Sequence, residues 1–196
     1  MQSIQTVSEN TIYVGASDRR LAKFENLFPI PRGVSYNAYV ILDEKTALLD
    51  TADASVGAQF LENVAAALDG RKLDYLIVDH MEPDHAAMIE AVLVRWPDLR
   101  LVVNAKTLPM LKMYFPTDSA AFDDALVVKE GDTLDLGKHK LTFVMAPMVH
   151  WPEVMMTFDT TTGTLFSADA FGTFGALEGA LFADEVDFAG KWLDDA

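Results

Sequence analysis

Residues 73–78 read Leu-Asp-Tyr-Leu-Ile-Val, and residues 80–85, one position further on, read His-Met-Glu-Pro-Asp-His. Five of the first six residues are apolar, which predicts a buried strand. The second segment holds four potential metal ligands: His80, Glu82, Asp84 and His85. They follow the end of the predicted strand, where open α/β sheets place their chemistry. Two imidazoles with two carboxylates favour a metal harder than the usual structural zinc, with iron as the leading candidate.

The composition bounds the class of protein. A chain of 196 residues, half of them apolar, suggests one domain, or a domain and a fraction, with a sizeable core. The formal net charge of -15 disfavours nucleic acid and anionic membranes as partners, and it suits a basic redox protein or a small neutral substrate. An alternative explanation is that the negative charge serves only to keep the protein soluble. The absence of cysteine excludes disulfides, iron–sulfur clusters, thiolate zinc sites and cysteine nucleophiles.

Targeting signals are not evident in the sequence. Residues 1–10 are polar and contain no apolar signal core. No apolar run reaches the ~20 residues that a membrane helix needs. We therefore expect a cytoplasmic protein that does not enter a membrane.

Strands and helices are expected along the whole length, which predicts a layered α/β fold. Predicted strands cover residues 12–14, 36–42, 46–49, 73–78, 99–103, 126–128, 133–136, 141–146, 154–158 and 164–167. Predicted helices cover residues 55–68, with Ser55 as the cap, 86–96, 106–115 and 185–195. The last of these ends on Asp194 and Asp195, where acids oppose the helix dipole, so we expect that the chain was cut or that a longer parent continued here.

Two further metal donors follow predicted strands. His150 comes after the strand 141–146, and Asp169 comes after the strand 164–167. A lone His or Asp in such a place is more often a turn residue, but three strand ends with donors favour convergence on one metal centre. Asp84 has a structural alternative as a helix cap. His139 lies in a predicted hairpin turn and is expected to be solvated.

The motifs together resemble the diiron domain of the flavodiiron proteins. They are His-x-Glu-x-Asp-His at 80–85, His-Trp-Pro at 150–152 and Asp-Ala-Phe-Gly at 169–172. The resemblance covers nearly the whole chain and implies a metallo-β-lactamase-like αββα sandwich over residues 1–196. Zinc hydrolases of that superfamily usually carry His-x-His-x-Asp-His. Glu82 at the second histidine position resembles the iron-binding branch, because a carboxylate is harder and stabilises higher iron oxidation states.

The resemblance also implies the ligands and the reaction. His80, Glu82 and His150 would bind one iron, Asp84 and His85 the other, and Asp169 would bridge both. Such a centre reduces O2 to water or nitric oxide to nitrous oxide. Its electrons come from FMN in a following flavodoxin-like domain, fed by rubredoxin or a similar donor. A head-to-tail homodimer or a hetero-assembly is implied.

Two features of the family pattern are missing. The family has a further histidine on the second iron, yet no histidine follows His150, and no flavodoxin domain follows either. We therefore expect the C-terminal part of the sandwich to be absent from this chain, with FMN supplied by another domain or chain. Asp84, His85 and Asp169 alone would form a weak second site.

Alternatives remain open at this stage. The chain could be an O2-binding sensor module without its own flavin. It could also be a zinc metallohydrolase of the same fold, although Glu82 argues against this. Phe171 and Phe174, in Phe-Gly-x-Phe-Gly, could form an apolar lid for a gaseous substrate or a tightly packed loop.

Overall fold

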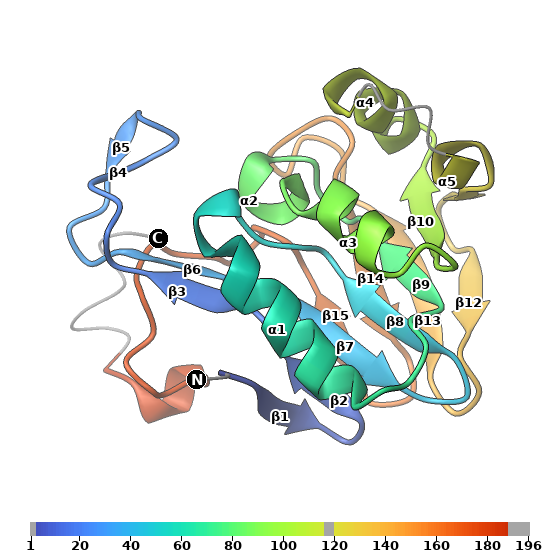
Figure 1. The fold of residues 1–196 in the computed structure, drawn as a ribbon, viewed down its shortest axis with the longest axis horizontal. Coiled ribbons are helices and arrows are strands. Elements are labelled where there is room, and N and C mark those ends of the chain that lie inside the picture. Colours follow the sequence, from blue (N-terminus) through green and yellow to red (C-terminus); the bar gives the residue numbers. More distant parts are fainter. Residues whose placement is uncertain (1–2, 116–119, 188–196) are drawn as a thin grey trace.

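The computed structural model describes residues 3–115 and 120–187, and two sheets pack face to face in it (Figure 1). The larger sheet has seven strands in the order β1-β2-β7-β8-β9-β10-β11. Its strands are β1 (Gln5–Ser8), β2 (Thr11–Tyr13), β7 (Tyr39–Leu42), β8 (Thr46–Leu49), β9 (Tyr75–Ile77), β10 (Arg100–Asn104) and β11 (Leu126–Val128). From β8 to β11 neighbouring strands are parallel, whereas β1, β2, β7 and β8 pair antiparallel.

The smaller sheet is an antiparallel meander. It consists of β12 (Thr133–Asp135), β13 (Lys140–Met145), β14 (Met155–Asp159) and β15 (Thr164–Phe166). Two short antiparallel ribbons stand beside the sandwich: β3 (Ala16–Asp18) with β6 (Val34–Tyr36), and β4 (Lys23–Phe24) with β5 (Phe28–Pro29). The predicted strand 36–42 is thus divided between β6 and β7.

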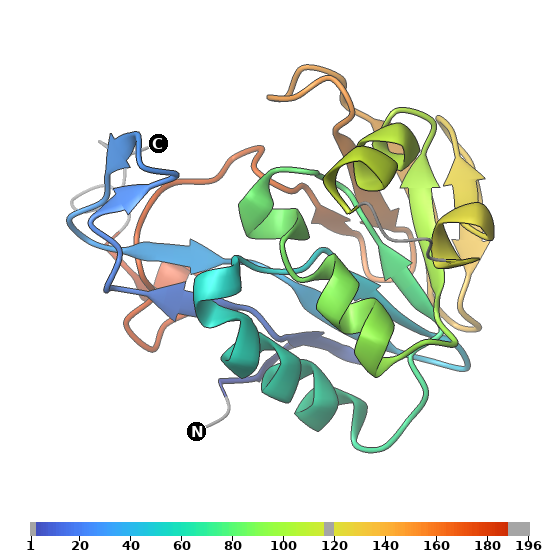
Figure 2. The ribbon, with the colours of Figure 1, turned by 45° about the horizontal axis from the view of Figure 1, so that its top comes forward.

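Helices cover the outer face of the larger sheet. The α-helices are α1 (Gly57–Leu68), α2 (Pro83–Ala86), α3 (Ile89–Arg95), α4 (Thr107–Tyr114) and α5 (Ala120–Asp123), and the 3-10 helices are η1 (Ala54–Val56) and η2 (Ala183–Glu185). Figure 2 shows α1 and α3 lying over this sheet. Within the described residues the layers are therefore helix, sheet and sheet, three layers of the predicted αββα sandwich.

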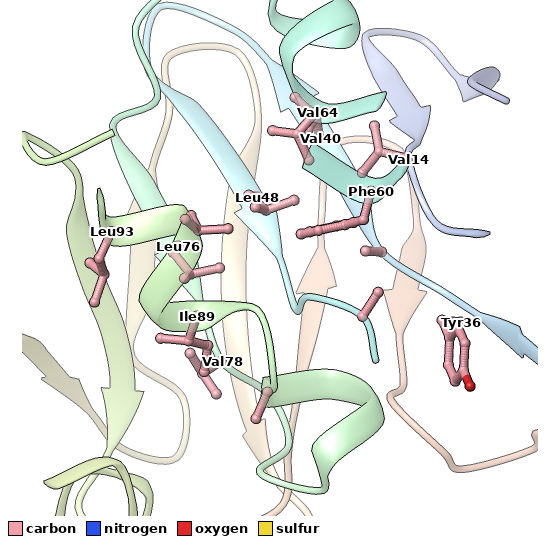
Figure 3. Close-up of a cluster of buried hydrophobic side chains, with 14 of the residues drawn as sticks. Val14, Tyr36, Val40, Leu48, Phe60, Val64, Leu76, Val78, Ile89 and Leu93 are labelled. Carbon is pink, nitrogen blue, oxygen red and sulfur yellow. The ribbon is translucent and has the colours of Figure 1, made fainter. Parts of the chain in front are cut away.

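Two apolar cores hold the layers together. Phe60 and Val64 of α1 point toward Leu48 of the sheet, and Ile89 of α3 lies beside Leu76 (Figure 3). Full burial of one such side chain contributes about 1.5–3 kcal/mol. The second core lies between the sheets and includes Ile41, Leu49, Ile77, Leu141, Phe143 and Met155.

The predicted helix 86–96 is wrong in its bounds, because two helices occupy this region. α2 begins at Pro83, whose fixed φ suits the first helical position. The ladder stops because the carbonyl of His85 accepts from the N–H and the hydroxyl of Thr51, at 2.8 and 2.6 Å. Asp84 consequently lies inside a helix, and no side-chain hydrogen bond caps α2.

Other helix predictions also change. Ser55 is not the cap before α1, because Asp53 accepts the Ser55 N–H at 2.7 Å and starts η1. Most of the predicted helix 185–195 lies outside the described residues, and Glu185 ends η2. No described helix combines the length and the apolar character needed to cross a membrane.

His139 is buried, so its predicted solvation is wrong. Its Nδ1 lies 2.7 Å from Oδ2 of Asp159, the last residue of β14, and both residues have no exposed surface. The turn between β12 and β13 folds inward because Asp43 accepts the backbone N–H of His139 at 2.6 Å. The carboxylates of Asp159 and Asp43 thus bind the ring and the backbone N–H of His139, in place of the solvent that an exposed turn would offer.

The replacement Asp159→Asn is expected to lower the free energy of unfolding by about 1–3 kcal/mol. The amide loses the charge-assisted bond to His139 and weakens the bond from the Thr162 hydroxyl, which is 2.7 Å long. Urea unfolding measures the effect as a lower midpoint with an unchanged slope. Asp98→Asn, at an exposed position, is the control and should stay within about 0.5 kcal/mol of wild type. Equal midpoints for the two variants would contradict the prediction.

Candidate metal centre

The structure brings the six predicted donor residues together where both sheets end. His80 and Glu82 lie in the loop after β9 and Asp84 and His85 lie in α2, whereas His150 lies between β13 and β14 and Asp169 follows β15. The larger sheet therefore supplies four donors and the smaller sheet two. Pro83 at the start of α2 turns the chain so that donors on both of its sides face the same point.

The donors form two groups that share Asp169. The first group contains His80, Glu82, His150 and Asp169, and the second contains Asp84, His85 and Asp169. Oδ2 of Asp169 lies 3.2 Å from Nε2 of both His80 and His150. Its other oxygen, Oδ1, lies 2.8 Å from Nε2 of His85. One carboxylate thus offers a separate oxygen to each group, as a bridging ligand does.

The spacing within the first group fits a metal ion. Two ligands at about 2.1 Å from one ion, at right angles to each other, lie about 3.0 Å apart. Nε2 of His150 is 2.8 Å from Oε2 of Glu82, and Nε2 of His80 is 3.2 Å from the same oxygen. In the second group, Oδ1 of Asp84 is buried and has no hydrogen-bond partner among the described residues. An unsatisfied buried carboxylate oxygen is what a missing cation would leave.

The electrostatics favour positive charge at this place. Burial lowers the pKa of His80, but hydrogen bonds to Asp169, Glu153 and Glu82 outweigh it and raise the pKa to about 11. The pKa of His85 is also raised well above its usual value, because hydrogen bonds to carboxylates again outweigh burial. Without a metal, both side chains are therefore imidazolium cations at neutral pH, with a proton on each ring nitrogen.

The carboxylates respond in two ways. Burial raises the pKa of Asp84 to about 7. Burial acts in the same direction on Asp169, but hydrogen bonds from His80 and His85 hold its pKa well below the usual range. Asp169 is therefore the fixed negative charge between two cationic rings, and protons hold positions that a divalent cation would take.

Carboxylates behind the imidazoles were missed by sequence reasoning. Oδ2 of Asp50 lies 3.0 Å from Nδ1 of His85, and Oε1 of Glu153 lies 2.8 Å from Nδ1 of His80. Asp79 stands beside them, with its N–H donating to Asp50 at 2.7 Å. Asp50 follows a strand and Glu153 follows His-Trp-Pro, so position along the sequence offered a signal for both.

A cavity of about 320 Å³ opens onto the donors. Its apolar wall includes Phe24, Phe28 and Phe174. Phe174 packs against Phe24 with ring centroids 5.1 Å apart, whereas Phe171 is 89% exposed. Of the two predicted lid residues, only Phe174 faces the donors.

Comparison with known proteins places the chain. A family model described as the ODP family beta lactamase matches residues 34–192. The chain belongs to this family. Among curated relatives, the anaerobic nitric oxide reductase flavorubredoxin of Klebsiella pneumoniae is 38% identical over 183 residues, which cover 92% of this chain and 37% of that protein. A flavorubredoxin homolog of Escherichia coli O157:H7 is also 38% identical, with 44% of its length covered.

Solved structures of flavodiiron proteins share the fold. The rubredoxin oxygen:oxidoreductase from Desulfovibrio gigas has a TM-score of 0.89 and 30% identity, covering 96% of this chain and 46% of that one. The flavodiiron protein from Giardia intestinalis has a TM-score of 0.87 and 27% identity, covering 97% and 45%. The chain spans less than half the length of each relative. The flavodiiron resemblance and the predicted fold class are confirmed, and neither the sensor nor the zinc-hydrolase alternative is favoured.

Binding of a divalent cation to these donor groups is expected to release protons. At pH 7 the raised pKa values keep His80 and His85 protonated, and ligation requires neutral rings. The apparent association constant should therefore rise between pH 7 and 9, by about tenfold per pH unit for each proton displaced. Calorimetric titration of Co2+ in buffers of different ionisation enthalpy counts the protons.

His139→Gln is the control for this titration. His139 lies outside both donor groups, so this variant should release as many protons as wild type. An affinity that does not change with pH would contradict the prediction.

Proposed function

We propose that residues 1–196 form the diiron domain of a flavodiiron-type oxidoreductase that reduces O2 to water, nitric oxide to nitrous oxide, or both. The observation that carries the proposal is the division of the Asp169 oxygens between two donor groups. Its support from comparison is that relatives are named a nitric oxide reductase flavorubredoxin and a rubredoxin oxygen:oxidoreductase.

In this proposal each donor group holds one iron. His80, Glu82 and His150 would bind the first iron, Asp84 and His85 would bind the second, and Asp169 would bridge them. The hard carboxylates and borderline imidazoles are ligands that suit iron. Electrons would come from FMN, held in a flavodoxin-like domain or in a separate chain, and rubredoxin or a similar protein would pass electrons to the FMN. The working assembly is a homodimer or a hetero-assembly.

Residues of this chain would prepare the site for a diatomic gas. A bound iron pair would supply redox-active metal with open coordination positions. Glu82, Asp84 and Asp169 balance its positive charge. Phe24, Phe28 and Phe174 give the cavity an apolar wall, which admits a small gas and limits the water around the donors.

The test uses the chain loaded anaerobically with Fe2+, with a flavoprotein reductase, rubredoxin and NADH as the electron source. Wild type should bind iron tightly at the first donor group and more weakly at the second, and it should consume O2 or nitric oxide, as gas electrodes record. Asp169→Asn should bind fewer irons and lose about 100-fold or more of the rate, because it removes the ligand common to both groups.

Asp98→Asn is the matched control, since it makes the same chemical change at an exposed position outside both donor groups. Reversible O2 binding without turnover would replace the proposal with a sensor. Retention of zinc with hydrolytic activity would replace it with a metallohydrolase.

A further inference from the structure

Glu153 contacts His80 on the side opposite the metal donors. Its Oε1 lies 2.8 Å from Nδ1 of His80, and the two residues are 1% and 0% exposed. Nε2 of the same ring faces Glu82 and Asp169, each at 3.2 Å. Because a neutral imidazole carries one proton, a proton held on Nδ1 by Glu153 leaves the Nε2 lone pair free for a metal.

Glu153 is itself held in place from the larger sheet. The Met81 N–H donates to Oε1 at 3.0 Å, and Nδ2 of Asn104 donates to the Glu153 carbonyl at 2.5 Å. Oδ1 of Asn104 also accepts the N–H groups of Lys106 and Thr107, at 2.8 and 3.1 Å. Asn104 ends β10, so the backbone of Glu153 is tied to a parallel strand beside β9, while the Met81 N–H holds its carboxylate beside His80.

A purely structural role explains this carboxylate poorly. Its Oε2 is buried and has no hydrogen-bond partner among the described residues. An unsatisfied buried oxygen on a charged group destabilises the fold, and an apolar residue of similar shape would avoid that loss. The arrangement is accounted for if the negative charge serves the ring that it contacts.

We propose that Glu153 is a positioning residue that acts through His80, fixing the orientation and proton position of the imidazole so that Nε2 binds the first metal ion. The inference rests on the metal centre of the proposed function. Asp50 holds the same relation to His85, at 3.0 Å, so each donor group contains one imidazole backed by a carboxylate. Such outer partners typically change metal affinity by about 10–100-fold.

A double-mutant cycle tests the proposal on the metal-free full chain, with Co2+ binding followed by its visible absorption. Glu153→Gln should weaken binding of one ion by about 10–100-fold. In the His80→Gln background, the same change should have an effect of less than about threefold, because the residue through which Glu153 acts is gone. Equal weakening in both backgrounds, or none in either, would overturn the proposal.

Asp159→Asn is the matched control. It disrupts an equally buried carboxylate–histidine pair, with Asp159 0% exposed and 2.7 Å from His139. Asp159 is at the far end of β14 from Glu153, so a strand about 14 Å long separates the two residues. This variant should lose stability and keep the wild-type Co2+ affinity.

A measurement on wild type needs no variant to fold. In the chain labelled with 15N-histidine and loaded with Zn2+ as a diamagnetic probe, His80 should carry its proton on Nδ1, protected from exchange by Glu153. Zn2+ on Nδ1, or a rapidly exchanging Nδ1 proton, would overturn the proposal. Failure of the proposed function would be seen in a different experiment. If iron-loaded wild type reduced neither O2 nor nitric oxide, the proposed function would be wrong, but the Co2+ affinities and the histidine NMR spectrum would still decide the role of Glu153.

Discussion

The contacts of Asp169 with His80 and His85 are the constraint on which the site depends. Asp169 follows the smaller sheet and the histidines follow the larger one, so these contacts join the ends of both layers at 2.8–3.2 Å. The apolar core between the sheets fixes their separation, and the donor side chains meet across it at this rim. Buried ion pairs add little net stability, because desolvation offsets their attraction. Their value here is positional, because a loop arrangement that separated the histidines from Asp169 would leave buried charges with one fewer partner.

Strand order and backbone hydrogen bonds bring the donors to that rim. The parallel order of β8, β9 and β10 places their carboxyl ends at one edge, which brings Asp50 and Asn104 beside the donor loop. Thr51 then takes the His85 carbonyl out of the helical ladder. A continuous helix would carry the chain straight onward, whereas the interrupted one keeps His85 against Asp50. The site is therefore assembled by hydrogen bonds that end regular structure as much as by the strands that precede it.

Sequence patterns predicted the structural features that depend on residues close together along the chain. They missed the features that depend on contacts between residues far apart in the sequence. The strands and the six donors were visible because apolar runs and short motifs are local signals. Glu153 and His80 are 73 residues apart, so their contact is not visible in the sequence, although Glu153 directly follows His-Trp-Pro. The burial of His139 depends in the same way on Asp159 and Asp43, which lie in other strands and loops. The break between α2 and α3 was missed because Thr51, 34 residues away, causes it.

The donor groups place several carboxylates close to one another in a largely buried site. Several buried carboxylates in one place repel each other, and the repulsion must be compensated in the folded state. The raised pKa values of His80 and His85 mean that two protons supply this compensation. A metal that binds here would exchange with those protons. Carboxylates behind the rings serve both states, because Glu153 and Asp50 stabilise the imidazolium without a metal and hold the Nδ1 proton when Nε2 is a ligand.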